Sequence, residues 1–398
     1  MAIMDLKFLV FLIALLLVWE TQVQAETKVF NVINYGAVAD GSKDNAQAFL
    51  DAWNDACQYE GNGRMYIPSG TYQLNHVQFK GPCNGGMEFM IQGTLKAPTD
   101  PKLFFVSETW INFQYVSALT IYGGGTLDGQ GASAWKDNTC STNPSCRTLP
   151  TALRLDFTNT SQIRDLVSLN SKNVHLTLYG CDNVEISNIK ISAPGDSPNT
   201  DGIKMAKSKN IRIIHSDIGT GDDCIAMLDG LYDIQISGVT CGPGHGISIG
   251  SLADSRDIED VSRITVRNCR LHDTTNGLRL KTWASPYKGR VFNLTYEDIV
   301  MENVQNPIII DQNYCPHCRC NSTASSHVHI SNVRFKNIRG TSSSEYAVTL
   351  NCSQARPCTD MRLEDIKLEY KSRGTPALSS CSHARGASYR PLRPLSCL

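Results

Sequence analysis

The stretch that decides the fold is Asn183–Ile191, which reads Asn-Val-Glu-Ile-Ser-Asn-Ile-Lys-Ile. Similar segments follow at Asn210–Ile218, Asp233–Val239, Arg263–Cys269 and Asn293–Ile299. Each opens on a polar residue and continues with alternating apolar residues, a period of two that is typical of half-buried β-strands. Their starts lie 27, 23, 30 and 30 residues apart, which is the length of one solenoid coil and too short for a βαβ unit.

A second short apolar segment follows these strands at a fixed phase. It recurs as Cys224–Met227, Ile247–Ile249, Leu278–Leu280 and Ile308–Ile310. An antiparallel sandwich would also contain short strands. It would not explain why a second apolar strand follows at the same position in each repeat. We therefore predict an all-β fold, a single-stranded right-handed parallel β-helix in which every coil adds one strand to each sheet.

The two ends of the chain depart from this repeat. Asp44–Cys57 has small or apolar residues at helical spacing, which predicts a short N-terminal capping helix. Gly374–Leu398 is rich in Ser, Arg and Pro, and we expect an irregular wrap there. No linker divides the chain, so we expect one domain over residues 26–398.

Residues 1–25 have the pattern of a secretory signal peptide. Lys7 precedes an apolar run, Phe8–Trp19, and a short polar stretch then ends at Ala25. Twelve helical residues span roughly 18 Å, well short of the ~30 Å hydrocarbon core, which argues against a membrane anchor. We expect cleavage after Ala25 and a secreted protein.

The composition narrows the possible partners. Lys plus Arg is 37 and Asp plus Glu is 38 in 398 residues, a formal charge of -1 without a long basic run. Nucleic-acid binding relies on many phosphate contacts, so it is not expected. We expect a monomer that does not bind membranes.

The fifteen cysteines fit an oxidising compartment. Zinc is the competing interpretation, because Cys315, Cys318 and Cys320 lie close together, but a matching second pair is lacking. An odd count leaves at least one thiol over. Glycosylation is possible at four sequons, which begin at Asn159, Asn293, Asn321 and Asn351.

Three polar clusters interrupt the apolar pattern about one coil apart. They are Asn199-Thr200-Asp201, Gly221-Asp222-Asp223 and Gly244-His245-Gly246, with steps of 21 (201 to 222) and 23 (222 to 245) residues. Neighbouring rungs of a parallel sheet lie ~4.8 Å apart, so the clusters should stack on one face. Arg279 and Lys281 follow, and on a strand both would point the same way.

This combination indicates an acid/base site. Three carboxylates in close proximity repel one another, so at least one should have a raised pKa. A protonated carboxyl beside an ionised one is what glycoside hydrolysis needs, and the cations would suit an anionic sugar. Alone, Asp222-Asp223 could equally be a turn or half of a calcium site. We expect neither a metal nor a cofactor.

The motifs also resemble those of the polygalacturonases, the pectin-hydrolysing glycosidases of family 28. The similarity runs from about residue 28 to the C-terminus, and Phe79–Cys83 and Gln92–Pro98 look most like the plant exo-acting, pollen-type branch. The motifs that carry it are Ser197–Gly202, Gly219–Cys224, Cys241–Gly250, Arg279–Trp283 and Ile308–Cys315.

This resemblance implies hydrolysis of α-1,4-galacturonosyl bonds with inversion in the plant cell wall. Asp222 would be the general acid, Asp201 and Asp223 would hold and activate water, and His245 would tune the acid. Inversion predicts an acid-to-base separation of roughly 6.5–9.5 Å. In substrate binding, Arg279 and Lys281 would grip the galacturonate carboxylate, Tyr314 would bind the adjacent sugar and Asn199 would orient the site.

The resemblance also supports a disulfide between Cys224 and Cys241, which could bridge neighbouring coils behind the site. Two short-range pairs are further candidates, Cys352 with Cys358 and Cys381 with Cys397. Lys204 is a departure, since many relatives have His there.

Three questions stay open at this level. A pectate lyase, which would need calcium and an Arg base, is one alternative to a hydrolase. A non-catalytic solenoid that binds cell-wall polysaccharide is another. Exo and endo action are not distinguished, because they depend on loops that close one end of the cleft.

Overall fold

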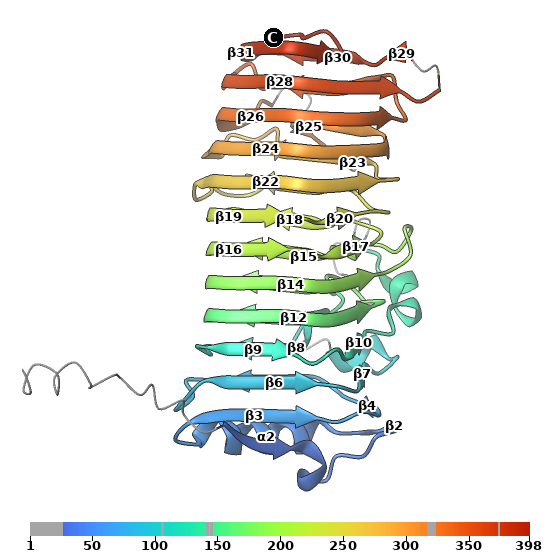
Figure 1. The fold of residues 1–398 in the computed structure, drawn as a ribbon, viewed down its shortest axis with the longest axis vertical. Coiled ribbons are helices and arrows are strands. Elements are labelled where there is room, and N and C mark those ends of the chain that lie inside the picture. The colour runs from blue at the N-terminus through green and yellow to red at the C-terminus, as the bar shows by residue number, and fades with distance from the viewer. Residues whose placement is uncertain (1–26, 105–106, 141–142, 144–145, 317–323, 373–374) are drawn as a thin grey trace, which may run out of the picture.

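The strands of the protein stack along one axis as a parallel β-helix, with successive coils following the chain from end to end (Figure 1). The computed structural model describes residues 27–398 except 105–106, 141–142, 144–145, 317–323 and 373–374. The expected signal peptide therefore lies outside the described residues. The predicted parallel β-helix is confirmed.

Two sheets carry the described strands. Sheet 2 consists of parallel strands that each pair with the next coil: β5 (Val77–Lys80), β8 (Thr109–Gln114), β11 (Thr151–Asp156), β13 (Leu176–Tyr179), β15 (Ile203–Ala206), β18 (Ile225–Met227), β21 (Ile247–Leu252), β23 (Asn276–Trp283), β25 (Asn306–Tyr314), β27 (Tyr346–Asn351) and β30 (Leu378–Ser382).

Sheet 1 is larger because most coils add two strand segments to it. Several long strands contain both segments and so join the two columns of strands into one sheet. Its members are β1 (Thr27–Asn31), β2 (Asp40–Asp44), β3 (Asn62–Ile67), β4 (Thr71–Gln73), β6 (Met87–Ile91), β7 (Thr94–Lys96), β9 (Leu119–Tyr122), β10 (Thr126–Asp128), β12 (Asn159–Leu169), β14 (Asp182–Ser192), β16 (Lys209–Ile214), β17 (Asp217–Gly219), β19 (Tyr232–Ser237), β20 (Thr240–Cys241), β22 (Val261–His272), β24 (Lys288–Val304), β26 (His327–Ser342), β28 (Cys358–Tyr370), β29 (Thr375–Pro376) and β31 (Ala384–Arg393).

The long strands of sheet 1 bend at left-handed residues that are aligned from coil to coil. Asn188 (φ 51°) in β14 is level with Asp165 in β12, and Asp298 (φ 57°) in β24 is level with Asn337 in β26. Asn and Asp tolerate this conformation better than other L-residues, because their short side chains bond to the local backbone. The polar residues that open each repeat, such as Asn183, are also left-handed. These columns explain why the sequence repeats a polar residue at fixed places.

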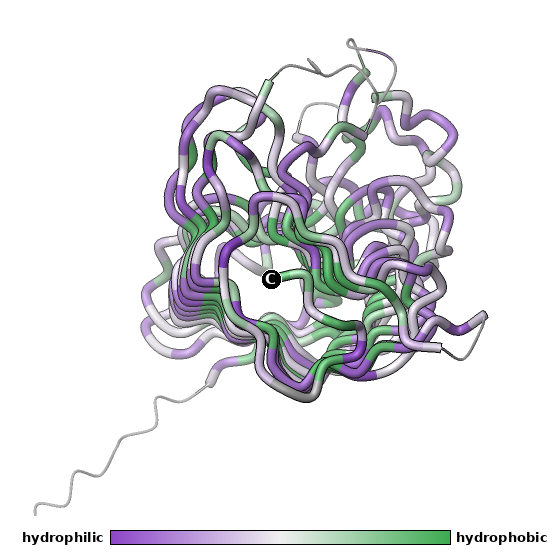
Figure 2. Tube along the Cα trace, turned by 90° about the horizontal axis from the view of Figure 1, so that it is seen from above, coloured by the Kyte–Doolittle hydropathy of each residue, from purple (hydrophilic) through white to green (hydrophobic). Residues whose placement is uncertain are grey.

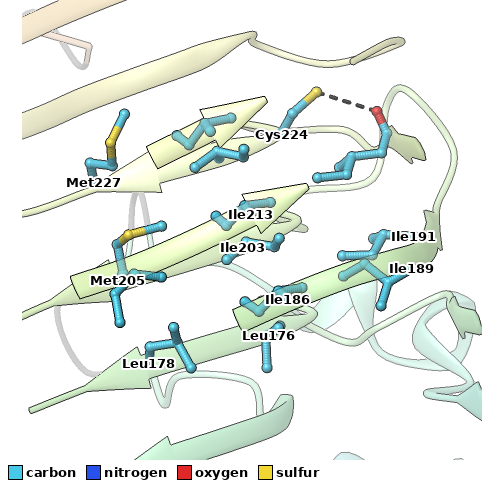
Figure 3. Close-up of a cluster of buried hydrophobic side chains, with 14 of the residues drawn as sticks. Leu176, Leu178, Ile186, Ile189, Ile191, Ile203, Met205, Ile213, Cys224 and Met227 are labelled. Atoms are coloured by element: carbon cyan, nitrogen blue, oxygen red, sulfur yellow. Dashed lines mark hydrogen bonds between the residues drawn. The ribbon is translucent and has the colours of Figure 1, made fainter. Parts of the chain in front are cut away.

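The interior is filled by columns of aliphatic side chains. Leu178, Met205 and Met227 are paired across successive strands of sheet 2, and each is 0 % exposed. Figure 3 shows this column with its neighbours, and Figure 2 shows the coils nearly superimposed around a common interior. Each fully buried aliphatic side chain contributes about 1.5–3 kcal/mol. A slip of one residue would turn the column outward, so burial fixes the register.

The N-terminal end is covered as the sequence predicts. Helix α2 (Ala46–Gln58) buries Phe49 and Trp53 against the first coils, and it lies at the blue end of Figure 1. The short 3-10 helices are η1 (Val32–Tyr35), η2 (Pro101–Phe104), η3 (Gly131–Ser133) and η4 (Trp135–Asp137). Within the described part of the chain, no helix is both long and apolar enough to span a bilayer.

The C-terminal tail differs from the expected irregular wrap. β30 pairs with β27, and β31 pairs with β28, so the tail adds one more coil. The alternation is weak there because the last coil has no further coil stacked on it, and its strands are held by backbone hydrogen bonds.

The disulfides tie neighbouring parts of the solenoid. All three expected pairs are bonded, Cys224–Cys241, Cys352–Cys358 and Cys381–Cys397, and Cys57–Cys83 and Cys140–Cys146 are bonded too. Among the described residues, Cys181 and Cys269 are buried free thiols. Cys315 is disulfide-bonded, whereas Cys318 and Cys320 lie outside the described residues.

Candidate active site

The three polar clusters meet where the chain turns from sheet 1 into β15, β18 and β21. The first residues of these strands are in register, and Asp201, Asp223 and His245 each precede that residue by two positions. They therefore form one column with a spacing of 22 residues (201 to 223, 223 to 245), on rungs about 4.8 Å apart. Asp222 lies one residue outside the column, so the carboxylate in phase with Asp201 is Asp223.

Glycines allow these turns to approach one another. Gly246 has a φ of 87°, and a Cβ there would lie 2.1 Å from the carbonyl oxygen of Asn276. A Cβ on Gly221 would lie 2.0 Å from the carbonyl oxygen of Ser197. Neither position has room for a side chain, which is why glycine flanks the carboxylate pair and the histidine.

Asp222 is paired with His245. The imidazole Nδ1 lies 3.0 Å from Asp222 Oδ1, and Asn199 Nδ2 donates to the other carboxylate oxygen at 3.3 Å. Burial by itself would raise the pKa of Asp222, but the hydrogen bond and charge of His245, with the charge of Lys281, lower it to about 2. The hydrogen bond to Asp222 raises the pKa of His245. The pair is therefore favoured as carboxylate and imidazolium.

Both carboxylate oxygens of Asp223 accept hydrogen bonds from neighbouring side chains. Ser248 Oγ donates to one carboxylate oxygen at 2.6 Å, and Lys281 Nζ donates to the other at 2.8 Å. The side chains of Lys281 and Asp223 are 8 % and 3 % exposed, so this is a buried ion pair. Lys281 was expected to grip a substrate carboxylate, but in this structure its ammonium is bonded to Asp223.

Asp201 has a different environment. Its side chain is 6 % exposed, and Lys204 Nζ lies 3.1 Å from its Oδ2. Burial raises the pKa of Asp201 to about 6, with the charges of Asp222 and Asp223 adding to the rise and Lys204 opposing it. The raised pKa expected for one of the three carboxyls therefore falls on Asp201, not on Asp222.

Arg279 and Tyr314 lie together on the C-terminal side of the acids. The Arg279 guanidinium is 5.1 Å from the centre of the Tyr314 ring, and the Trp283 ring packs edge-on against the same ring with their centres 5.4 Å apart. The buried Nε of Arg279 has no hydrogen-bond partner among the described residues. Arg279 thus has one donor that no described protein group satisfies.

A cleft of ≈ 420 Å³ opens over these groups. Of the eight predicted catalytic and substrate-binding residues, His245 and Arg279 are not among the lining residues but contact two that are, Asp222 and Tyr314. The six that line it are Asn199, Asp201, Asp222, Asp223, Lys281 and Tyr314. The cleft combines several carboxylates with fixed cations, which fits proton transfer on an anionic substrate.

Sequence reasoning missed several residues that shape this site. Ser248 bonds Asp223, Asn138 Nδ2 donates to Asn199 Oδ1 at 3.0 Å, and Arg256 lines the cleft. Lys204 was noticed only as a departure. Lys204, Ala226, Ser248 and Arg279 occupy the same register position on the adjacent strands β15, β18, β21 and β23. Alignment of the repeats with Arg279 could therefore have found Lys204 and Ser248.

The spacing of the acids and His245 also raises the question of whether they bind a metal ion. Ligand atoms of Asp222, Asp223 and His245 lie within 4.8 Å of one another, a spacing that could hold an ion. The separation of Asp222 and Asp223 is thus shorter than the roughly 6.5–9.5 Å expected between acid and base, which leaves Asp201 as the candidate base. Both oxygens of Asp223 already accept hydrogen bonds, one of them from the ammonium of Lys281, which would repel a cation. The donor set therefore fits proton transfer better than metal binding.

The sequons differ in exposure. Asn159 and Asn293 are exposed, Asn351 is half-buried, and Asn321 lies outside the described residues. Glycosylation at any of them stays a prediction.

A known glycosidase family matches most of the chain. Residues 57–390 match the family described as Glycosyl hydrolases family 28. An exopolygalacturonase of Platanus acerifolia is 44% identical over 364 residues, covering 91% of this chain and 96% of the relative. A polygalacturonase of Gossypium barbadense is 42% identical over 388 residues, covering 97% and 94%.

Solved structures share the fold. The endo-xylogalacturonan hydrolase of Aspergillus tubingensis matches with a TM-score of 0.79 at 23% identity, covering 92% of this chain and 100% of that one. A Thermotoga maritima exopolygalacturonase matches with a TM-score of 0.71 at 20% identity, covering 87% and 90%. From the family match and the curated relatives, the chain belongs to glycosyl hydrolase family 28.

Proposed function

We propose that this protein is a polygalacturonase that hydrolyses α-1,4-galacturonosyl bonds of pectin with inversion and removes units from a chain end. The polygalacturonase and exopolygalacturonase relatives support the substrate class. The observation that carries the proposal is the convergence of Asp201, Asp222 and Asp223 in one cleft, with His245 bonded to Asp222.

The catalytic proton would come from Asp222. The hydrogen bond between Asp222 and His245 lowers the pKa of Asp222 and raises that of His245, so the imidazole would hold the proton of the pair in the free protein. A bound sugar displaces water from the pair, and desolvation favours its neutral form, with the proton on Asp222. Asp222 then protonates the glycosidic oxygen as the bond to the anomeric carbon breaks.

Water would attack from the opposite face. Asp201 and Asp223 lie on adjacent rungs and would hold this water between them, and an ionised Asp201 would accept its proton. Lys204 stabilises the ionised form of Asp201, and Lys281 and Ser248 fix the orientation of Asp223.

The cations would select an acidic sugar. Arg279 has an unsatisfied donor beside Tyr314, and Tyr314 lines the cleft where its hydroxyl could hydrogen-bond a sugar. Asn199 would orient the glycosidic bond through its contact with Asp222. A neutral sugar would leave these cations without a partner.

Action at a chain end is supported by the residues on the N-terminal side of the cleft. Asn138 directly follows η4 and donates to Asn199, so η4 (Trp135–Asp137) would form a wall on this side of the acids. A wall there would limit how many sugar units extend past Asp222. The exopolygalacturonases among the relatives also support this mode.

The remaining expectations concern the protein as a whole. We propose that residues 1–25 direct secretion to the plant cell wall and that residues 26–398 act there as one monomeric domain. The apolar run Phe8–Trp19 and the disulfides support secretion.

The test is a time course with polygalacturonic acid. Early release of monogalacturonate alone supports an exo-hydrolase, whereas mixed oligomers with a rapid fall in viscosity would indicate endo action. Products with ultraviolet absorbance would indicate a lyase, and binding without cleavage would indicate a non-catalytic solenoid.

A second substrate tests the roles. An aryl galacturonide with a good leaving group needs no general acid. Asp222→Asn should therefore retain far more activity on this substrate than on the polymer, while Asp201→Asn should lose both. The reverse result would exchange the two roles.

A further inference from the structure

A second concave site lies next to the candidate cleft, on the other side of the loop that follows β21. This groove has a volume of ≈ 340 Å³. Its walls come from that loop and from the first residues of β24 and β26, together with Arg356 before β28. Ile258 lines both the cleft and the groove, so the two cavities share a wall.

The floor of the groove is tightly packed. The backbone N–H of Ile258 donates to the carbonyl of Lys288 at 2.9 Å, and the N–H of Lys288 donates to Asp257 Oδ1 at 2.8 Å. A Cβ at position 289 would lie 2.0 Å from the Ile258 side chain. Glycine at 289 thus lets the loop lie directly on β24, so the shared wall is held by packing and hydrogen bonds.

Cationic and titratable side chains gather around this floor. Lys288 is level with His327, and Arg290 is level with His329, on rungs about 4.8 Å apart. Arg290 is bonded to Asp260, and His329 Nε2 lies 3.2 Å from Thr359 Oγ1. The side chains of Lys288, His327 and Arg356 make no ion pair or hydrogen bond with the residues that the structure describes, and Lys288 and Arg356 are exposed.

Two carboxylates, Asp257 and Asp260, also line the groove and offset part of its positive charge. Asp260 is engaged by the Arg290 guanidinium, and Asp257 accepts a backbone N–H. With Lys288, Arg290 and Arg356 against these two acids, the lining has a surplus of positive charge before either histidine is protonated. A groove of this kind attracts carboxylates, and guanidinium groups bind them in bidentate fashion.

We propose that this groove is a remote binding site for uronate units of the same acidic polysaccharide whose bond lies in the cleft. The inference rests on the proposed function, because it takes the ligand to be a polygalacturonate chain. Such a polymer carries one carboxylate per sugar, and the groove has Lys288 and His327 at paired positions of β24 and β26, with Arg356 just before β28. Long chains would span the Ile258 wall and contact both cavities, whereas short oligomers would fill the cleft alone.

The experiment compares substrate lengths in one double variant. Lys288→Ser/Arg356→Ser removes the two exposed, unpaired cations. The control Lys190→Ser/Arg339→Ser removes two exposed cations from strands β14 and β26 on sheet 1, outside the groove lining. For each protein, kcat/KM is measured on polygalacturonic acid and on trigalacturonate, at low and at moderate NaCl.

We expect the ratio of polymer to trigalacturonate kcat/KM to fall about three- to tenfold in the groove variant, from two lost exposed ion pairs. The loss should appear as a higher KM for the polymer and shrink as salt rises. The control should keep the wild-type ratio, and melting temperatures verify that both variants fold.

The outcomes separate this inference from the proposed function. If the wild type cleaves both substrates and the groove variant keeps its ratio, the groove does not bind substrate. Inhibition by dextran sulfate is measured on the same proteins. If the groove variant keeps its polymer-to-trigalacturonate ratio but is inhibited less by dextran sulfate, the groove is a general anion site and the inference is wrong. If the wild type cleaves neither substrate, the proposed function itself has failed.

Discussion

The buried ion pair between Lys281 and Asp223 gives the sharpest stability prediction. Its atoms are 2.8 Å apart, and both side chains are less than a tenth exposed. At an effective dielectric constant of about 20, the direct attraction is about 6 kcal/mol, and the cost of burying both charges offsets much of it. Removing one partner leaves the other charge buried and unpaired, which typically costs about 3–5 kcal/mol.

Lys281→Met should therefore lower the melting temperature by roughly 3–10 °C, taking about 1–2 °C per kcal/mol for a chain of this size. The double variant Lys281→Met/Asp223→Asn should lose much less than the two single variants together, because no buried charge remains unpaired. Calorimetry on the four proteins measures this coupling.

A matched control is Arg212→Met, which breaks a surface pair with Glu185 whose side chains are 57% and 31% exposed. Exposed pairs contribute at most about 1 kcal/mol. The reasoning is refuted if Lys281→Met melts no lower than Arg212→Met, or if the double variant shows the full sum of the single losses.

Four further predictions concern the site and its support. Asp222→Asn should lower turnover of polygalacturonic acid by about three orders of magnitude, the scale of general acid catalysis, and a near-normal rate of reducing-end release would end the acid assignment. Lys204→Met removes a cation 3.1 Å from Asp201, so the pKa of Asp201 should rise further and the acidic limb of the pH–rate profile should move up by about one unit. An unmoved limb would show that Asp201 does not control it. Because burial raises the pKa of Asp201 from 3.8 to about 6, its ionised form costs up to about 3 kcal/mol above pH 6 and nothing below pH 3.8, so Asp201→Asn should melt higher than the wild type at pH 7.5 but not at pH 3.5. Replacing both Cys224 and Cys241 by Ser opens a bond with a sequence separation of 17 and should cost about 3 kcal/mol, which a melting curve would detect.

The repeating pattern of the chain was sufficient to predict the architecture. Alternating apolar residues in segments such as Asn183–Ile191 can be buried only on one face of a strand, and their spacing leaves room for only one coil per repeat. The capping helix followed from helical spacing in the same way. The C-terminal tail was wrongly expected to be irregular, because its strands are held by backbone hydrogen bonds that leave no apolar pattern.

The sequence by itself also determined which residues form the candidate site, since the clusters at Asp201, Asp222 and His245 share the period of the coil. Only the tertiary structure decided how they are paired. Register puts Asp223 in line with Asp201, and side chains from later coils reach back to these acids, so that Lys281 neutralises Asp223 and His245 binds Asp222. The charge state of each carboxyl depends on burial and on neighbours far away in sequence, which spacing alone does not specify.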